Sequence, residues 1–261
     1  MKWRKFGFGV VLGVGIVFIS LIGEIKKLPN GKLQVVFCDV GQGDAIYIKT
    51  PKGKDILIDG GPDEKVLTCL SNHMVFWDKN MEMVFLTHPH ADHLTGILSV
   101  LDRYSVGYLF WSGREGNSAE YKELVSRIKS LRVKNLSAGD RIKTGDGVEI
   151  RVLWPPKDFM VSDLNQQSLV LKINGGLFMG DASVRNLIGE NIGQVNILKV
   201  PHHGAKDALE ENFLEMIRPK VAVISVGKDN RYGHPAKKTL DLLEKIGAKI
   251  LRTDLDGEIT L

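Results

Sequence analysis

The chain has 261 residues, of which 43% are hydrophobic and 25% are charged, a composition typical of a folded domain that excludes a disordered or collagen-like protein. Residues 1–32 hold six of the 35 basic residues and one of the 31 acidic residues, which leaves 29 bases and 30 acids in residues 33–261. The net charge of +4 therefore comes from the N-terminal segment, and the domain's near-neutral charge gives no support to tight, sequence-independent binding of nucleic acid.

An uncharged apolar stretch lies near the N-terminus, in residues 6–23, between basic residues on both sides. Eighteen residues of α-helix reach about 27 Å, close to the thickness of a bilayer core. We expect residues 1–32 to contain a basic cytoplasmic tip, a single transmembrane anchor in the lipid bilayer and a short linker, with residues 33–261 as a hydrolase domain outside the cytoplasm. The alternative is a cleaved signal peptide, but no A-x-A-like cleavage site follows the stretch.

The apolar stretch also contains the spacing G-x-x-x-G, from Gly9 to Gly13. Small residues at this spacing let membrane helices pack closely together. A homodimer formed through this segment is therefore an open prediction.

The first predicted elements are three short strands, Leu33–Cys38, Ala45–Ile48 and Ile56–Ile58, separated by glycine-rich and proline-containing turns. Such turns are typical of adjacent antiparallel strands. The glycine-rich loop at residues 39–44 joins two strands and opens no helix, so it is not a phosphate-binding P-loop.

Two aspartates and two cysteines are notable in this region. Asp39 and Asp59 each follow a strand, and we predict that they either orient ligand histidines or serve as turn residues. Cys38 ends an apolar strand, which favours a buried free thiol. A disulfide between Cys38 and Cys69 is the alternative for an exported domain.

Four side chains that can ligate a metal follow the apolar run Met83–Leu86 within six residues: His88, His90, Asp92 and His93. Imidazole and carboxylate groups suit zinc or a similar divalent ion, and their number exceeds what one tetrahedral ion with an open position can use. The spacing therefore predicts a site for two metal ions. A helix predicted at Leu94–Leu101 places the end of this loop at a helix N-terminus.

Other candidate ligands also follow predicted strands. His202 and His203 come after residues 195–200, His234 follows residues 221–225 and a loop, and Asp181 ends the strand Gly176–Met179. His73 has no strand before it, so we expect it to lie outside the site.

The remaining predicted elements form two successive halves in which strands come first and then alternate with helices. This order predicts an α/β fold in the form of a four-layer αββα sandwich. The predicted helices span residues 63–74, 118–131, 208–217 and 235–246, and the further strands span residues 106–111, 133–136, 141–143, 148–153, 169–173, 196–200, 249–251 and 258–261.

Taken together, T-H-P-H-A-D-H at residues 87–93 and the motifs at residues 37–45, 180–182, 201–204 and 232–235 resemble the metallo-β-lactamase superfamily. In this order they are most similar to the metallo-β-lactamase domain of ComEC-type DNA-internalisation competence proteins and their stand-alone relatives. The resemblance covers roughly residue 33 to the C-terminus.

The resemblance implies two divalent ions, zinc or alternatively manganese, bridged by Asp181. No histidine occurs between residues 93 and 181, although many members of the superfamily have a ligand in that interval. We therefore expect one ion on His88, His90 and one of His202 and His203, and the other on Asp92, His93 and His234. Asp92 would also orient the attacking water and accept its proton, which makes Asp92 and Asp181 the expected catalytic residues.

Three functions compete at this stage. The first, implied by the resemblance, is a membrane-tethered, extracytoplasmic phosphodiesterase, most simply a nuclease that cleaves single-stranded DNA. The second is a metallohydrolase of another ester, such as a phosphorylcholine ester, a lactone or a β-lactam. The third is an inactive metal-binding domain that holds DNA or a channel partner.

Overall fold

The computed structural model describes residues 21–261, whose strands and helices follow one plan in each half of the chain. In the first half three antiparallel strands are followed by parallel strands with helical connections. Its elements are β1 (Gln34–Phe37), β2 (Ile46–Lys49), β3 (Asp55–Ile58), α2 (Lys65–His73), β4 (Asn80–Leu86), α3 (Ala91–Arg103), β5 (Ser105–Trp111), α4 (Ala119–Arg127), η1 (Ile128–Ser130) and β6 (Val133–Asn135).

The second half repeats this plan, with an antiparallel meander that is followed by parallel strands. Its elements are β7 (Arg141–Lys143), β8 (Glu149–Trp154), η2 (Asn165–Gln167), β9 (Val170–Ile173), β10 (Gly176–Phe178), η3 (Val184–Leu187), β11 (Ile197–Lys199), η4 (Pro201–Gly204), α5 (Glu211–Ile217), β12 (Val221–Ile224), α6 (Lys237–Lys245), β13 (Lys249–Arg252), α7 (Thr253–Asp256) and β14 (Ile259–Thr260).

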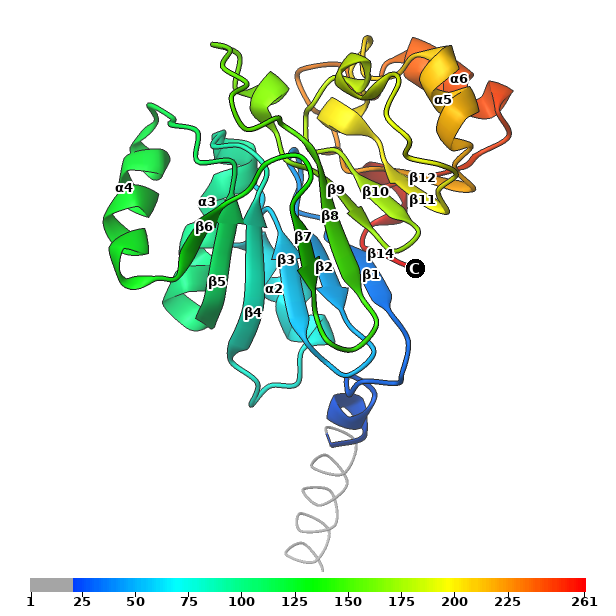
Figure 1. Ribbon diagram of the computed structural model, residues 1–261. Helices are drawn as coiled ribbons and strands as arrows, with labels where there is room; N and C mark the ends of the chain where they lie inside the picture. Colours follow the sequence, from blue (N-terminus) through cyan, green and yellow to red (C-terminus); the bar gives the residue numbers. More distant parts are fainter. Residues whose placement is uncertain (1–20) are drawn as a thin grey trace, which may run out of the picture.

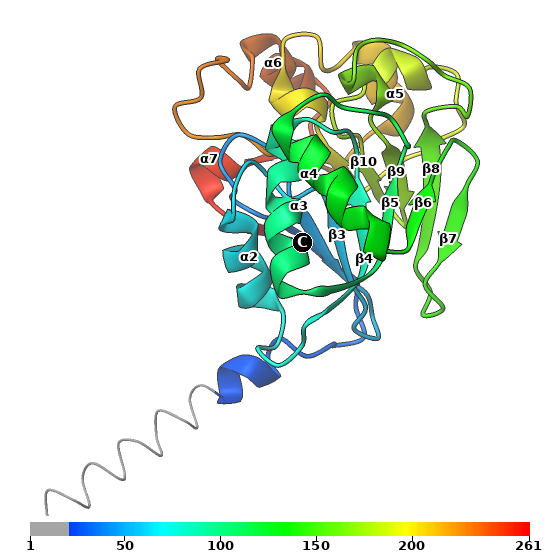
Figure 2. The same ribbon diagram turned by 90° about the vertical axis from the view of Figure 1, so that its left-hand side faces the viewer.

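These elements form two seven-stranded sheets that pack against each other (Figure 1). The strand orders are β14-β1-β2-β3-β4-β5-β6 and β13-β12-β11-β10-β9-β8-β7. Figure 2 shows α2, α3 and α4 over the outer face of the first sheet, with α5 and α6 on the side of the second. The predicted αββα sandwich is confirmed.

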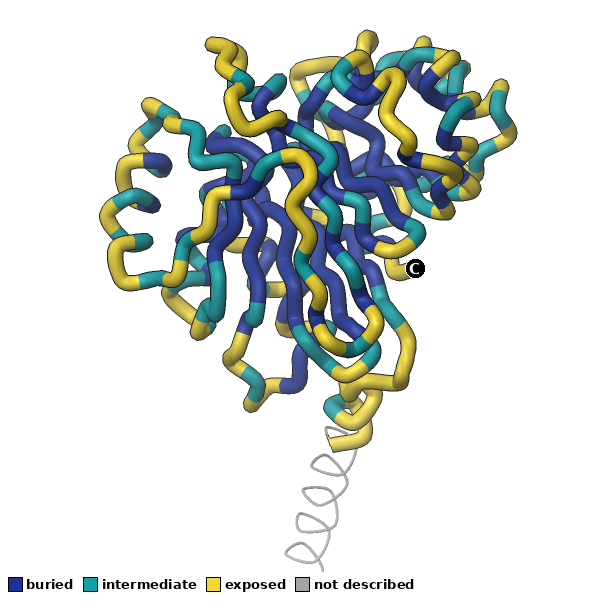
Figure 3. The backbone as a smooth tube through the Cα atoms, viewed as in Figure 1, coloured by how far each residue is buried: buried dark blue, intermediate teal, exposed yellow. Residues whose placement is uncertain are grey.

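Three hydrophobic clusters correspond to the three contacts between the four layers. One lies between the first sheet and its helices, one between the second sheet and its helices, and one between the two sheets. In β1, Val36 packs toward the helices, while Val35 and Phe37 pack toward the second sheet. Because side chains alternate across a strand and both faces are covered, central strands such as β2 and β3 are buried along their whole length (Figure 3).

The last strand, β14, crosses back from the second half and pairs antiparallel with β1. The sequence predicts a strand here but not its partner, because strand pairing depends on contacts between distant residues. Helix α4 is also shorter than the expected span of residues 118–131: it ends at Arg127, and a 3₁₀ turn follows it. Its start matches the expectation, since Ser118 caps the helix by accepting a hydrogen bond from the backbone N–H of Tyr121.

The expectation of a free Cys38 thiol was wrong. Cys38 forms a disulfide with Cys69, with a Cα–Cα distance of 5.7 Å. The bond joins the end of β1 to the buried face of α2, which packs on the first sheet. Local sequence could not decide this pairing, because the two cysteines are 31 residues apart and meet only when α2 docks.

Replacing Cys69 by serine is expected to lower the free energy of unfolding by about 3–4 kcal/mol, since the disulfide closes a loop of this length in the unfolded chain. Urea unfolding of the wild-type and Cys69→Ser proteins, each with and without dithiothreitol, would measure the effect. The reductant should lower the wild-type midpoint toward that of the variant and leave the variant unchanged. Equal midpoints under oxidising conditions would show that the disulfide contributes nothing to stability.

Across residues 21–261, no helix is both long and apolar enough to cross a bilayer. Most of the apolar stretch at residues 6–23, on which the membrane anchor was predicted, lies outside the described residues.

A buried polar cluster lies at the amino end of β3, at the opposite end of this strand from Asp59. Asp55 accepts a hydrogen bond from the hydroxyl of Tyr47 and lies 3.9 Å from the ammonium of Lys49. Burial raises the pKa of Asp55 to about 6, although Tyr47 and Lys49 oppose this shift. The carboxylate therefore ionises at a higher pH in the folded protein than in the unfolded chain.

The cluster should make stability depend on pH. Because the folded-state pKa of about 6 exceeds the unfolded value of 3.8, the folded protein binds more protons between these two values, and stability falls as pH rises through this window. The loss is up to about 3 kcal/mol. Urea unfolding from pH 4 to pH 7 should show this decline in the wild type but not in Asp55→Asn. Parallel curves for the two proteins would contradict the assignment.

Candidate active site

The histidine loop connects β4 to α3 at the carboxyl edge of the first sheet. β4 is parallel to both neighbouring strands, and this edge of a parallel arrangement is where α/β proteins place their ligands. Thr87 anchors the loop, because its backbone N–H and its hydroxyl both donate to the carboxylate of Asp59 at 2.8 Å. The predicted ligands His88, His90, Asp92 and His93 all lie in this loop or in the first turn of α3.

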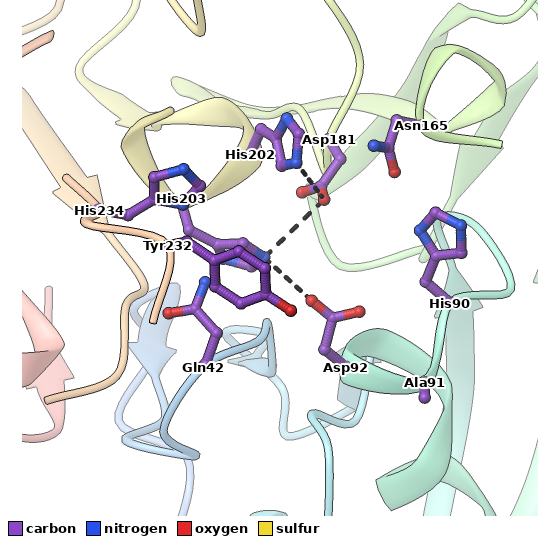
Figure 4. A pocket seen from close by; sticks show the side chains of 10 residues that line it. All are labelled: Gln42, His90, Ala91, Asp92, Asn165, Asp181, His202, His203, Tyr232 and His234. Carbon is purple, nitrogen blue, oxygen red and sulfur yellow. Dashed lines mark ion pairs between the residues drawn. The ribbon is translucent and has the colours of Figure 1, made fainter. Parts of the chain in front are cut away.

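The second sheet supplies the other candidates at the same edge. Asp181 lies in the turn after β10, and His234 lies in the loop between β12 and α6. His202 and His203 lie in η4, and both have a positive φ, of 50° and 52°. This conformation costs a non-glycine residue about 1–3 kcal/mol and is concentrated at functional sites. In Figure 4, His202 and His203 both point toward Asp181, and the ring of His203 lies between the carboxylates of Asp181 and Asp92.

The carboxylate of Asp181 is surrounded by imidazoles. Its Oδ2 atom lies 3.5 Å from Nε2 of His93, 3.8 Å from Nε2 of His88, 3.8 Å from Nε2 of His203 and 3.9 Å from Nε2 of His202. Asp92 completes the arrangement, since its Oδ2 lies 3.4 Å from Nε2 of His203 and 3.8 Å from Nε2 of His93. His93 and His203 therefore each lie between two carboxylates.

The opposite nitrogen of each buried ring is held by the protein. Nδ1 of His93 lies 2.8 Å from Oδ2 of Asp59, and Nδ1 of His203 donates to the backbone carbonyl of Ser225 at 2.9 Å. Nδ1 of His88 contacts the hydroxyls of Thr87 and Ser168, at 3.0 and 3.1 Å. These contacts leave the three Nε2 atoms facing the carboxylates, the arrangement that metal-binding histidines usually have.

The residues fit divalent cations. Nε2 of His93 and Nε2 of His203 are buried and have no hydrogen-bond partner, so the fold leaves two imidazole nitrogens free for another ligand. Ligand atoms lie within 4.8 Å of one another in four overlapping groups: His88, His93 and Asp181; Asp92, His93 and His203; Asp44, Asp181 and His203; and Asp44, Asp59 and His93. The first two contain only ligands predicted from the sequence and are the compact groups discussed below. Two overlapping groups of this kind are suited to a pair of cations.

The grouping differs from the expected division of ligands. The expectation placed a histidine of the 202–203 pair with His88 and His90, but His203 lies with Asp92 and His93. His90 contacts Nε2 of His88 through its Nδ1 atom at 3.0 Å and lies outside the two compact groups. Local spacing could not show this, because the position of His203 depends on how the two sheets pack.

His234 lines the same cavity but lies outside both compact groups, with its ring centroid 5.9 Å from that of His202. Its Nδ1 atom is buried without a hydrogen-bond partner. Burial lowers the pKa of His234, and the neighbouring histidines 202 and 203 lower it further, so the ring is held neutral. His73, by contrast, pairs with Glu258 at 2.7 Å and takes no part in the cavity.

The cavity has a volume of about 350 Å³, within the range of small-molecule sites. Its lining is polar and contains hydrogen-bond donors as well as the candidate ligands: Gln42, His90, Ala91, Asp92, Asn165, Asp181, His202, His203, Tyr232 and His234. The ribbon and side chains in Figure 4 show that these residues come from both sheets. Neither half of the chain builds the cavity alone.

Asp39 and Asp59 have different positions. Asp59 is buried and contacts His93, as an orienting carboxylate would. Asp39 is exposed and accepts a 3.4 Å hydrogen bond from the N–H of Gly41, so it belongs to the turn. The buried carboxylate from this loop is instead Asp44, which lies 3.7 Å from Nδ1 of His93.

Sequence reasoning missed Asp44 and also Lys199. Lys199 is fully buried at the end of β11 and forms an ion pair with Asp44. The signals were available: Asp44 immediately precedes an apolar strand, and Lys199 interrupts the apolar run of residues 195–200. Their relation appears only when the two sheets come together.

The charged groups of the site shift one another's pKa. Burial opposes ionisation of Asp44, but Lys199 and His203 outweigh it and lower its pKa to about 2. Burial likewise opposes the charged form of His203, but Asp181 and Asp44 raise its pKa to about 9. Burial lowers the pKa of His88 well below its ordinary value. Burial also opposes ionisation of Asp92 and Asp181, but His93 and His203 lower the pKa of both carboxyls, so these candidate ligands are ionised at neutral pH, as cation ligands must be.

The fold and this arrangement of histidines and aspartates define a metallo-β-lactamase-type hydrolase. The model of the metallo-beta-lactamase superfamily matches residues 38–228, so the chain belongs to that superfamily. This confirms the family indicated by the sequence motifs.

Within the superfamily the chain is similar to proteins named for competence and recombination. It is 28% identical to ComE operon protein 3 of Bacillus subtilis, over 87% of this chain and 32% of that protein. It is 27% identical to Recombination protein 2 of Haemophilus influenzae, over 98% of this chain and 31% of that protein. The chain therefore spans about a third of the length of these relatives.

A solved structure supports the fold. The metallo-beta-lactamase fold protein YhfI from Bacillus subtilis superposes with a TM-score of 0.58, covering 84% of this chain and 95% of that one. Its sequence identity is 9%, so the likeness concerns the fold alone.

Proposed function

We propose that this chain is a phosphodiesterase that requires two divalent metal ions, zinc or manganese, and that it cleaves nucleic acid, with single-stranded DNA as the favoured substrate. The observation that carries the proposal is the pair of overlapping ligand groups that share His93 beneath a polar cavity. Similarity to competence and recombination proteins supports a nucleic acid as substrate. The proposal concerns hydrolysis only, because the chain matches about a third of those proteins.

When bound, the divalent ions would polarise a phosphoryl oxygen and lower the pKa of a water molecule. The protein would hold them through the Nε2 atoms of His88, His93 and His203 and through the carboxylates of Asp92 and Asp181, with His234 in the cavity wall completing one of the two sites. Asp181 is suited to a bridging role, because its Oδ2 faces both groups of ligands.

Other residues would accept the proton of the attacking water and bind the substrate. The side chain of Asp92 is 36% exposed, so it can both face the ligands and reach a water in the cavity, whose proton it would accept. Gln42, Asn165 and Tyr232 line the cavity and can donate hydrogen bonds to phosphate oxygens. No serine or cysteine nucleophile is required by this scheme.

The test is to incubate the purified full-length chain with Zn²⁺ or Mn²⁺ and a panel of substrates. We expect cleavage of single-stranded DNA and of a generic aryl phosphodiester, and complete loss of both with a chelator. Turnover restricted to phosphorylcholine esters, lactones or β-lactams would overturn the nucleic-acid assignment. Stoichiometric metal binding without turnover of any substrate would instead indicate an inactive binding domain.

We also propose that the domain works outside the cytoplasm, tethered to the cell membrane by the apolar residues 6–23. The Cys38–Cys69 disulfide supports this location, because disulfides persist in oxidising compartments. A homodimer, indicated by the G-x-x-x-G spacing, and a channel partner both remain predictions.

Protease added to intact spheroplasts that express the chain is expected to degrade the domain, because an external domain is accessible to it. A cytoplasmic protein should survive as the internal control. Full protection of the domain would contradict the orientation, and recovery of a mature protein that begins near Glu24 would favour a cleaved signal peptide over an anchor.

A further inference from the structure

A buried lysine lies directly behind the candidate metal ligands. Lys199 is fully shielded from solvent, and its ammonium donates to the backbone carbonyl of Gly180 at 3.0 Å. The ammonium also pairs with Oδ2 of Asp44 and lies 3.8 Å from Oδ1 of Asp181. Lysine is almost never fully buried unless it is paired, so this placement requires an explanation.

Stability is a poor explanation for the pair. Removing two charges from water costs several kcal/mol per ion, and well-packed apolar residues of similar size usually serve a core equally well. A positive charge near two cations is also unfavourable by itself. The carboxylate of Asp44 cancels that charge, so the pair as a whole can lie beside a cation site.

The contacts of Asp181 indicate what the pair does. Oδ1 of Asp181 faces Lys199, whereas Oδ2 faces the imidazoles of the site, at 3.5 Å in the case of His93. Lys199 also binds the carbonyl of Gly180, the residue immediately before Asp181. The lysine therefore acts on both the backbone and the side chain that present this carboxylate.

Asp44 extends the contact to two histidines. Its Oδ1 lies 3.5 Å from Nδ1 of His203, and its Oδ2 lies 3.7 Å from Nδ1 of His93. Its backbone N–H donates to the carbonyl of Asp92 at 3.2 Å. One buried pair thus contacts four of the residues in the two ligand groups.

We propose that Lys199 and Asp44 form a positioning pair that holds the carboxylate of Asp181, with Oδ1 turned toward the lysine and Oδ2 turned toward the imidazoles of the candidate metal centre. This inference rests on the proposed metal centre and assigns to it two residues that do not ligate metal themselves. Loss of such a supporting contact typically weakens metal binding about tenfold to a hundredfold.

The test separates positioning from charge compensation by means of a double variant. Lys199→Met removes the ammonium with little change in volume but leaves Asp44 as an uncompensated buried charge, so this variant should be strongly destabilised. Lys199→Met combined with Asp44→Asn removes both charges and should recover much of the thermal midpoint. If the pair positions Asp181, the double variant should still bind Zn²⁺ at least about tenfold more weakly than the wild type.

The metal-binding readouts are competition with a chromophoric chelator and the visible absorption spectrum of the Co²⁺-substituted protein, which reports ligand geometry independently of activity. We expect a changed spectrum in the double variant. A wild-type spectrum and wild-type Zn²⁺ affinity in a stable double variant would overturn the proposal and leave the pair as a structural element.

The chain provides a matched control in its other buried lysine–aspartate pair, Lys49 and Asp55, 3.9 Å apart at the opposite end of β3. Lys49→Met combined with Asp55→Asn should leave Zn²⁺ affinity and the Co²⁺ spectrum unchanged. Equal losses in both double variants would overturn the proposal, because they would show a general response to the loss of a buried pair.

Two further outcomes are informative. If the wild type itself binds no divalent metal, the proposed metal centre fails, and this differs from a failure of the lysine assignment alone. If the Lys199 double variant does not fold, the ¹⁵Nζ signal of Lys199 in the wild type takes its place as the readout. That signal should shift when Zn²⁺ is added, and an unchanged signal would overturn the proposal.

Discussion

Asp181→Asn is expected to abolish most of the hydrolytic activity while leaving the fold intact. Oδ2 of Asp181 is the atom that the imidazoles of both ligand groups face, and a neutral amide is a poor bridge between two cations. We expect kcat/KM on an aryl phosphodiester to fall at least about a hundredfold, with weaker binding of at least one metal equivalent.

Metal content after equilibrium dialysis and steady-state kinetics would measure the two effects, and far-UV and near-UV circular dichroism would check the fold. Asp39→Asn is the matched control, because the same chemical change is made at an exposed turn residue that contacts no histidine of the site. It should behave as the wild type. Two equivalents of metal and normal turnover in Asp181→Asn would refute the bridging role.

His234→Ala is expected to weaken one of the two metal sites selectively and to lower activity at least about tenfold. The ring lines the cavity, its Nδ1 has no hydrogen-bond partner, and its lowered pKa keeps it in the neutral form that binds metals. Metal titration and kinetics on the same preparation would measure both effects.

His73→Ala is the control for this experiment, because His73 lies at the end of α2, pairs with Glu258 and does not line the cavity. It should change neither metal content nor rate. If His234→Ala retains two metal equivalents and loses only activity, His234 contacts substrate. If it retains both, the loop at residues 232–235 has a structural role.

The division of ligands between the two ions bears on both predictions. His93 belongs to both compact groups, and His203 lies with Asp92 and His93, where the expectation placed His234. Each ion would therefore draw ligands from both sheets. A variant of His93, which belongs to both groups, should therefore disturb both ions, whereas His234→Ala should disturb one.

The sequence by itself determined the elements and the identity of most candidate ligands. Strand patterns and turn residues are local, so they predicted the order of strands and helices and the sandwich they form. The candidate ligands His88, His90, Asp92 and His93 were identifiable because they are close together in the chain. Asp181 and the histidines at 202, 203 and 234 were identifiable because each follows a strand, and parallel strands end at a common edge.

Only the tertiary structure decided which of these residues meet. His203 joins Asp92, Cys38 pairs with Cys69, and β14 returns to β1, and each of these contacts joins residues that are far apart in the chain. Lys199 and Asp44 are a further example. In the sequence, Lys199 only interrupts an apolar strand and Asp44 is one of several polar loop residues, but in the structure they form an ion pair. Local patterns report the conformation of a few residues, whereas the partner of a buried charge is set by how the two sheets pack.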